Sequence, residues 1–204
     1  MILKVHLDNP QTRAVQKAAE ILAAGGAVIY PTDTVYGIGA SVDDKNAIEK
    51  IHTLKRQRQD RPFSFVCSDL THISEYAHVS NAAFKIMKRL IPGPYTFILP
   101  AARMKQLPKI LVSKRKTVGI RVPDSRVTLA IVRELGHPIL STSATGENGE
   151  VLNDPELIAD RYRNSVELIL DGGILTSEQS TVLDLTEDTP RVIRQGAGDA
   201  SFLG

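Results

Sequence analysis

The first part of the chain alternates between helical and extended patterns of apolar residues. Apolar side chains recur at the spacing of one helix face over 15–22, and two glycines at 25–26 end that pattern. A β-branched run over 27–32 predicts a buried strand that ends in a polar Thr-Asp-Thr turn, and an apolar stretch punctuated by glycine follows. Apolar spacing over 43–54 then predicts a second helix.

The same alternation continues in the rest of the chain and ends in closely spaced short strands. Ser68 and Ser80 are predicted N-caps of two helices, and Asp154 followed by Pro155 predicts the start of another. The strands predicted in this part cover 62–67, 95–100, 117–123, 138–145, 166–170, 181–185 and 191–195, with a further helix over 127–135. Strands that alternate with helices favour an α/β fold, a twisted mixed sheet with helices packed over it and some antiparallel pairing among the late strands.

Length and composition indicate a single domain over residues 1–204. A chain of 204 residues with 42% hydrophobic residues can bury one sizeable core. Apolar runs of the length of a membrane span are absent from the sequence, and the polar start MILKVHLDNP does not resemble a signal peptide, so we expect a cytoplasmic protein without a membrane partner. The single cysteine, Cys67, lies in the apolar run FSFVC, where it is predicted to pack in the core.

The net charge of +2 conceals two clusters of cations. Seven Lys and Arg residues and no acidic residue fall between Arg103 and Arg121, and four fall between Lys55 and Arg61 against the single carboxylate of Asp60. Clustered positive charge attracts phosphates. The alternative for each run is a solvated loop or helix end.

Sequence motifs of several enzyme classes are missing. The five histidines form no HExxH or HxE arrangement, and there is no GxSxG, no complete dinucleotide fingerprint and no P-loop. Hydroxyl groups and cations gather instead at predicted strand ends and loops, a set of groups that suits phosphates and a small carboxylate. These clusters are Thr32–Thr34, Lys55–Arg61, Lys114–Arg121, Ser141–Thr145, Ser180–Thr181 and Arg194.

Six sequence blocks, in order, resemble the YrdC/YciO-type family and span nearly the whole chain. They are GGAVIYPTDTVYGIGA (25–40), PGPYTFIL (92–99), TVGIRVPD (117–124), PILSTSA (138–144), STVLDL (180–185) and RVIRQG (191–196). The resemblance implies a YrdC-like twisted sheet with an open basic cavity. It also implies the activity of a threonylcarbamoyl-AMP synthase, a nucleotidyltransferase that uses ATP, L-threonine and bicarbonate for the modification of tRNA to N6-threonylcarbamoyladenosine at position 37.

The resemblance also implies roles for individual residues. Lys55 and Arg121 would act at the reacting phosphate. Thr32, Thr117, Arg121 and Ser180 would bind on the threonine side, whereas Lys55, Arg58, Arg61, Ser141, Ser143 and Arg194 would bind nucleotide and phosphate. Mg²⁺ is expected on the phosphates of ATP, with no metal held tightly by protein ligands. The implied partners are RNA or tRNA and the machinery that transfers the threonylcarbamoyl group.

Ordinary structural roles compete with these assignments. The turn at 32–34 is of a kind that hydroxyls and Asp cap by themselves. Arg121 lies inside an apolar strand and needs an anionic partner, either a ligand or a structural carboxylate such as Asp184. Arg194 can be an edge residue, and Tyr36 and Tyr95 are predicted to pack rather than to stack on a base.

The chain departs from the synthase pattern at two positions and there resembles the YciO-like branch. Synthases carry Lys-x-Arg where this chain has Lys55-Arg56-Gln57, and Ser-x-Asn where it has Ser143-Ala144-Thr145. A hydroxyl does not replace an amide, which offers donors and an acceptor on a longer side chain. The alternative function is therefore a YciO-type paralogue that binds nucleotide or double-stranded RNA without synthase activity.

Overall fold

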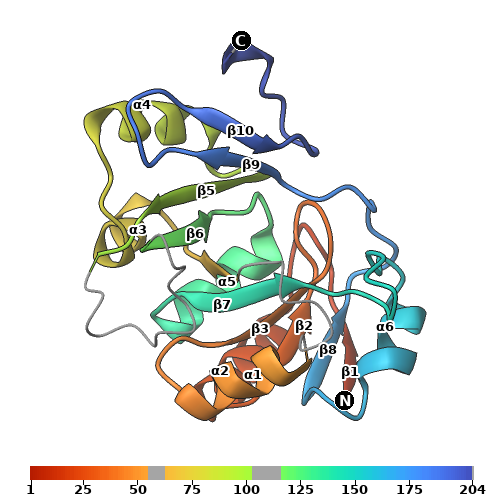
Figure 1. Cartoon of the computed structure of the whole chain (residues 1–204). Coiled ribbons are helices and arrows are strands. Elements are labelled where there is room, and N and C mark those ends of the chain that lie inside the picture. The colour runs from red at the N-terminus through yellow and green to blue at the C-terminus, as the bar shows by residue number, and fades with distance from the viewer. Residues whose placement is uncertain (55–62, 103–115, 204) are drawn as a thin grey trace.

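The structure, a computed structural model, describes residues 1–54, 63–102 and 116–203. Ten strands within these ranges form one sheet, in the order β1-β8-β2-β3-β7-β4-β6-β5-β9-β10 (Figure 1). The strands are β1 (Ile2–Lys4), β2 (Val28–Tyr30), β3 (Gly37–Ser41), β4 (Ser64–Val66), β5 (Tyr95–Pro100), β6 (Thr117–Arg121), β7 (Ile139–Ser143), β8 (Leu168–Asp171), β9 (Thr181–Asp184) and β10 (Arg191–Arg194).

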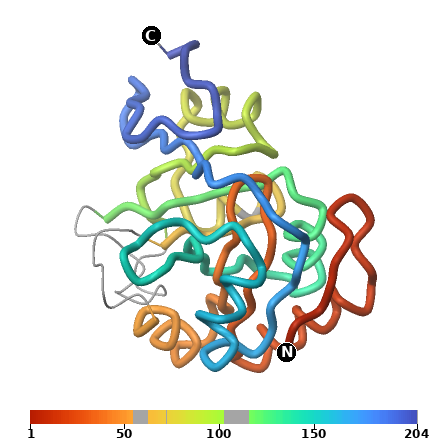
Figure 2. Tube along the Cα trace, turned by 90° about the vertical axis from the view of Figure 1, so that its right-hand side faces the viewer, coloured from red at the N-terminus to blue at the C-terminus, as the bar shows by residue number. Residues whose placement is uncertain are grey.

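The sheet mixes parallel and antiparallel pairs, as the sequence predicted. β8 runs parallel to β1 and β2, β4 parallel to β6, and β5 parallel to β9. The late pair β9 and β10 is antiparallel, but so are β2–β3, β3–β7, β4–β7 and β5–β6. Antiparallel pairing therefore extends through the centre of the sheet. The two edge strands come from the two ends of the chain, and the termini lie at opposite ends of the molecule in both views (Figures 1 and 2).

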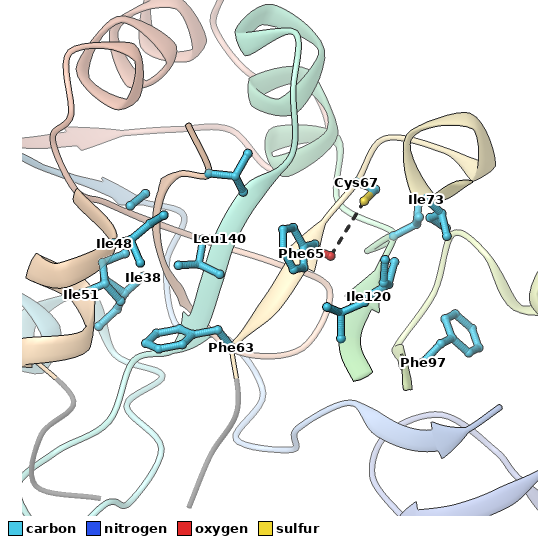
Figure 3. Close-up of a cluster of buried hydrophobic side chains, with 14 of the residues drawn as sticks. Ile38, Ile48, Ile51, Phe63, Phe65, Cys67, Ile73, Phe97, Ile120 and Leu140 are labelled. Atoms are coloured by element: carbon cyan, nitrogen blue, oxygen red, sulfur yellow. Dashed lines mark hydrogen bonds between the residues drawn. The ribbon is translucent and has the colours of Figure 1, made fainter. Parts of the chain in front are cut away.

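Helices cover both faces of the sheet. They are α1 (Thr12–Ala23), α2 (Lys45–Leu54), α3 (Leu70–Tyr76), α4 (Asn81–Leu90), α5 (Arg126–Leu135) and α6 (Pro155–Tyr162), with a short 3₁₀ helix at Ser201–Leu203. α1 and α5 share one apolar cluster with Tyr30 and Ile139, on what we call the α1/α5 face. The other four helices pack on the opposite face, where Ile48 of α2 and Ile73 of α3 join Phe65 in the larger cluster (Figure 3).

Most predicted helix ends are confirmed. Ser80 Oγ accepts from the backbone N–H of Ala83 at 3.1 Å, and Asp154 caps α6 with Pro155 at its first position. The prediction for Ser68 is wrong, because Asp69 is the residue directly before α3 and accepts the N–H of Thr71 at 2.8 Å, while the hydroxyl of Ser68 donates to Asp69. A carboxylate directly before the helix is better placed for this bond.

Cys67 is fully buried, as predicted. Burial raises the pKa of its thiol well above the usual value, and the nearby charges of Asp69 and Glu75 raise it further. The side chain belongs to the larger apolar cluster, beside Phe65 (Figure 3). A thiol in these surroundings stays neutral and acts as a small apolar side chain.

Candidate functional site

The loop that joins β2 to β3, residues 31–36, is fixed by the N-terminus of α5. The carbonyl of Pro31 accepts hydrogen bonds from Ser125 Oγ at 3.2 Å and from Thr128 Oγ1 at 2.9 Å. Ser125 is the N-cap of α5, and Thr128 belongs to the same helix. The beginning of the loop is therefore held independently of its polar residues at 32–34.

Thr32 stabilises the turn inside this loop. Its Oγ1 donates to the carbonyl of Val35 at 2.7 Å and accepts from the backbone N–H of Thr34 at 3.1 Å. This is the capping role that competes with ligand binding for a hydroxyl in a turn. A contact between Thr32 and threonine stays a prediction.

Arg121, at the end of β6, finds its anionic partner in the same loop. The residue is only 9% exposed, and its Nη2 donates to Asp33 Oδ1 at 2.5 Å and to Thr34 Oγ1 at 2.8 Å. The structural carboxylate is thus Asp33 and not Asp184, whose Oδ1 accepts from the backbone and side chain of Thr186. This corrects the carboxylate that the sequence suggested, although the need for one is confirmed.

The ion pair leaves polar atoms unsatisfied. Asp33 Oδ2 and Arg121 Nε are buried and have no hydrogen-bond partner within the part of the chain that the structure describes. The printed hydrogen bonds of the Arg121 guanidinium both come from Nη2, and the side chain as a whole is 11% exposed. Buried groups of this kind are uncommon outside functional sites.

A second set of hydroxyls lies beside Arg121. The pairing of Phe97 with Ile120 puts the next residues, Thr96 and Arg121, next to each other on adjacent strands. Thr96 Oγ1 is 2.9 Å from Ser180 Oγ, and both residues are buried. β5 and the residue directly before β9, which are distant in sequence, therefore place a pair of hydroxyls beside the strand position of Arg121.

Arg194 contacts Ser180 from the edge strand β10. Its Nε and Nη2 donate to the carbonyl of Ser180 at 3.2 and 2.7 Å, and its Nη1 donates to Gln179 Oε1 at 2.8 Å. The side chain thus holds the backbone that carries Ser180. Its predicted contact with phosphate remains a prediction.

The hydroxyls of β7 and β6 share the α1/α5 face with Arg121. Ser141 pairs with Ser64, and Ser64 pairs with Gly119, so the three positions lie side by side. Side chains alternate along a strand, so Thr117 and Arg121 project from the same face as Gly119, and Ser143 from the same face as Ser141. This face carries no bulky side chain at Gly119, where an added Cβ would lie 3.1 Å from Ser64 Oγ.

Tyr30 orients Ser141. It is fully buried, and its hydroxyl donates to Ser141 Oγ at 2.7 Å. Burial raises the pKa of Tyr30 to about 12, although the hydrogen bond to Ser141 and the charge of Arg121 act in the opposite direction. The phenol stays protonated at neutral pH and donates, which leaves the proton of Ser141 for another acceptor.

Two further tyrosines pack, as predicted, and also anchor loops. Tyr36 donates to the carbonyl of Gly173 at 2.7 Å and accepts from the N–H of Gly172 at 3.0 Å. Its pKa is raised to about 12, mainly by burial. Tyr95 donates to the carbonyl of Asp199 at 3.0 Å.

Tyr162 holds Thr145, which stands at one of the two departures from the synthase pattern. The hydroxyl of Tyr162 donates to the carbonyl of Thr145 at 2.6 Å and accepts its N–H at 3.3 Å. The backbone at this position is therefore fixed independently of its side chain. The other departure, Gln57, lies outside the described residues.

The structure brings together Arg121, Thr117, Ser141 and Ser143 on one sheet face, with Ser180 and Arg194 beside them. Lys55, Arg58, Arg61 and the cations from Arg103 to Arg115 lie outside the described residues, so the basic cavity remains a prediction. The sequence placed Asp33 and Thr34 in the Thr32–Thr34 cluster but did not identify Asp33 as the partner of Arg121, and it did not single out Thr96, Tyr30 or Ser64. Asp33 and Thr34 stand in the same block as Thr32, which is the signal that could have pointed to them.

Among the described residues, no group of three or more His, Cys, Asp or Glu side chains is arranged to hold a metal ion. Among the same residues, every helix is too short or too polar to cross a membrane.

Comparison with known proteins places the chain among relatives of two kinds. A sequence model of the Sua5/YciO/YrdC family, described as "Telomere recombination", matches residues 20–196. YciO of Escherichia coli is 44% identical over 197 residues, which cover 96% of this chain and 95% of that protein. Its crystal structure matches with a TM-score of 0.92 and 42% identity, covering 98% of both chains.

The other relatives carry the name of an enzyme. The threonylcarbamoyl-AMP synthase of Pyrococcus abyssi is 30% identical over 184 residues, which cover 89% of this chain and 54% of that protein. The structure of P. abyssi Sua5 complexed with L-threonine matches with a TM-score of 0.88 and 29% identity, over 96% of this chain and 57% of that one. The threonylcarbamoyl-AMP synthase of Vibrio vulnificus is 28% identical over 186 residues, which cover 89% of this chain and 98% of the synthase.

Proposed function

Because this chain belongs to the Sua5/YciO/YrdC family, we propose that it makes L-threonylcarbamoyl-AMP and pyrophosphate from ATP, L-threonine and bicarbonate, for the modification of tRNA at position 37. One observation carries the proposal. The buried guanidinium of Arg121 donates to Thr34 in the β2–β3 loop, and Thr96, its neighbour on β5, pairs with the hydroxyl of Ser180, directly before β9. A guanidinium surrounded by hydroxyls suits a small hydroxylated carboxylate such as threonine. The L-threonine complex of a relative supports this choice.

The reaction asks the protein for positioning and charge stabilisation. The amine of threonine takes up carbon dioxide derived from bicarbonate and loses a proton to give a carbamate. A carbamate oxygen then attacks the α-phosphorus of ATP, and the bond from that phosphorus to pyrophosphate breaks, with pyrophosphate leaving as the anion. Binding the two substrates in line supplies much of the rate enhancement. Mg²⁺, bound to the phosphates of ATP, would neutralise their charge.

The residues divide between the two substrates. The guanidinium of Arg121 would bind the threonine carboxylate, and the family resemblance assigns Ser180 and Thr117 to the same substrate. Ser141 and Ser143, on β7, which β4 separates from β6, would bind the nucleotide. From the family resemblance, Lys55, Arg58 and Arg61 would bind the phosphates.

A direct assay tests the proposal. Purified protein is incubated with ATP, Mg²⁺, bicarbonate and L-threonine, and threonine-dependent pyrophosphate and the threonylcarbamoyl adenylate are measured, the latter by mass. We expect both products in the wild type, and their loss in Lys55→Ala and Arg121→Ala. Lys17→Ala is the control, because Lys17 pairs only with Glu20 on the exposed surface of α1. The absence of both products while the V. vulnificus synthase is active in parallel would contradict the proposal.

The second candidate is a paralogue that binds nucleotide or double-stranded RNA without synthase activity. It is favoured by Thr145, which stands where synthases carry Asn, and by the 44% identity to YciO, whose name states no activity. Binding through a basic surface should weaken steeply with salt. A filter-binding assay at increasing salt tests it, and a lack of any salt-sensitive RNA retention would rule it out.

A further inference from the structure

The charge of Arg121 is balanced inside the fold. Its side chain is 11% exposed and that of Asp33 is 10% exposed, and the two are joined by a 2.5 Å contact from Nη2 to Oδ1. A buried guanidinium and a buried carboxylate at this distance together carry no net charge. A ligand that meets Arg121 therefore meets a dipole and not a free cation.

Nη1 is the nitrogen of the Arg121 guanidinium that remains for a ligand within the described part of the chain. Nη2 is occupied by Asp33 and Thr34, and Nε is buried without a partner among the described residues. A ligand oxygen that binds the guanidinium also comes close to the carboxylate of Asp33, because Asp33 is in direct contact with the same group. Like charges repel each other more strongly in partly buried surroundings than in water.

Ligands of different net charge respond differently to this arrangement. A phosphate group brings only negative charge, which Asp33 repels as Arg121 attracts it. An α-amino acid brings its carboxylate together with an ammonium group, and the ammonium is attracted to Asp33. The ion pair of Asp33 and Arg121, which is neutral as a whole, therefore favours a zwitterionic ligand over a polyanionic one.

We propose that Asp33 is a specificity-determining residue, which makes Arg121 select the zwitterionic amino acid and exclude the phosphates of the second substrate. The identity of that amino acid as L-threonine rests on the proposed function. The discrimination against phosphate by Asp33 follows from the ion pair itself and is measured separately. Arg121 is accordingly a carboxylate-binding residue, and the phosphates must be bound by other cations.

The loop tolerates a change at Asp33. Pro31 is fixed by Ser125 and Thr128, and the turn is closed by Thr32 and Val35, none of which uses the carboxylate. The side chain of Asn has the same shape as that of Asp and can still accept a hydrogen bond from Nη2. Asp33→Asn therefore removes the charge with little change in geometry, and thermal unfolding verifies that the variant is folded.

Calorimetric binding of inorganic pyrophosphate and of L-threonine, each without the other substrate, tests the proposal. In Asp33→Asn we expect pyrophosphate to bind about tenfold more tightly, equivalent to about 1.4 kcal/mol. The preference for L-threonine over pyrophosphate should fall by at least about the same factor. Asp33→Glu, which keeps the charge, and Asp33→Asn with Arg121→Gln, which lacks the guanidinium, should show no gain.

Asp184→Asn is the matched control. It removes one carboxylate charge from β9, where Oδ1 of Asp184 contacts Thr186 and an amide oxygen can do the same. Pyrophosphate binding that is unchanged in Asp33→Asn would overturn the proposal. So would an equal loss of both ligands, which indicates a structural role only, or a gain of equal size in Asp184→Asn.

The two hypotheses fail in different ways. A wild-type protein that does not bind L-threonine contradicts the proposed function. If Asp33→Asn still gains pyrophosphate affinity through Arg121 in that case, the exclusion of phosphates by Asp33 is supported nevertheless. If the wild type binds L-threonine and the variant shows no gain, the role of Asp33 alone is wrong.

Discussion

Tyr30 is a buried phenol whose protonation contributes to stability. Its pKa is about 12 in the folded protein, mainly because of burial, and about 10 in the unfolded chain. The folded value is the higher one, so the contribution is complete below pH 10 and is lost as the pH rises towards 12. Between pH 9 and 11 we expect the wild type to lose about 1.4 kcal/mol more unfolding free energy than Tyr30→Phe.

Urea unfolding at the two pH values measures this difference. At pH 9 the variant should be less stable by about 1 kcal/mol, because it lacks the hydrogen bond to Ser141. The cost of the lost hydrogen bond is the same at both pH values. It therefore cancels when the change in unfolding free energy between pH 9 and pH 11 is taken for each protein separately. Equal losses in the two proteins would show that Tyr30 does not contribute to the alkaline destabilisation.

Substitution of Thr145 tests whether the side chain at this position limits nucleotide binding. Its backbone is held on both sides by Tyr162, so an Asn side chain at this position should be presented from an unchanged backbone. We expect Thr145→Asn to lower the KM for ATP about tenfold in the pyrophosphate assay, since an amide adds donors and an acceptor. Thr145→Val is the control for packing, and an unchanged KM in Thr145→Asn would show that position 145 does not limit binding.

The sequence alone predicted part of what individual residues of the site do. It indicated that Arg121, a cation in an apolar strand, needs an anion. It could not identify that anion, because Asp33 and Arg121 are 88 positions apart and meet only through the sheet. Asp184 was an equally reasonable choice from the pattern of residues.

Elements with local signals were predicted well, and those defined by distant pairing were not. α6 begins at Pro155 after Asp154, as local capping rules require. β1 was not predicted, because Ile2–Lys4 is too short for a periodic pattern and pairs with β8 at the other end of the chain. Much of the strand order has the same origin, since pairs such as β1–β8, β3–β7 and β5–β9 join distant segments.

Gly196 controls the position of the segment that carries Ser180. A Cβ at Gly196 would lie 2.2 Å from the carbonyl oxygen of Gln179 and 2.7 Å from the carbonyl carbon of Ser180. Backbone atoms do not give way as the end of a side chain does. We expect Gly196→Ala to cost about 2 kcal/mol of unfolding free energy and to weaken L-threonine binding about tenfold, as Ser180 moves.

Gly173→Ala is the matched control for this change. Gly173 has φ +84° and nothing within 4 Å of an added Cβ, so the substitution strains the backbone without a clash. It should cost about 1 kcal/mol and leave L-threonine affinity unchanged. Denaturant unfolding and calorimetry measure the two quantities, and equal loss of affinity in both variants would contradict a local effect at Ser180.

At the scale of the molecule, the candidate site draws on both ends of the chain. The β2–β3 loop provides Asp33 and Thr34, β6 provides Arg121, the segment directly before β9 provides Ser180, and β10 provides Arg194. The larger apolar cluster likewise runs from Ala27 to Ala200. The binding residues and the core therefore depend on the same sheet.

This arrangement predicts that residues 1–204 unfold as one cooperative unit. A single continuous sheet, with apolar clusters on both faces, offers no boundary at which one half could melt alone. Since the chain contains no tryptophan, circular dichroism at 222 nm and the near-ultraviolet signal of its tyrosines are the suitable probes. Both should report one transition with the same midpoint.

L-Threonine extends this test from the fold to the site. A ligand at 100 times its Kd stabilises the folded state by about 2.7 kcal/mol, which raises the Tm of a chain of this size by about 5–10 °C. Because the binding residues come from the β2–β3 loop, from β6 and from the β9–β10 edge of one sheet, the whole transition should move, by both probes. A second transition that threonine leaves in place would show that part of the chain folds separately, and a single transition that does not move would show that threonine is not a ligand.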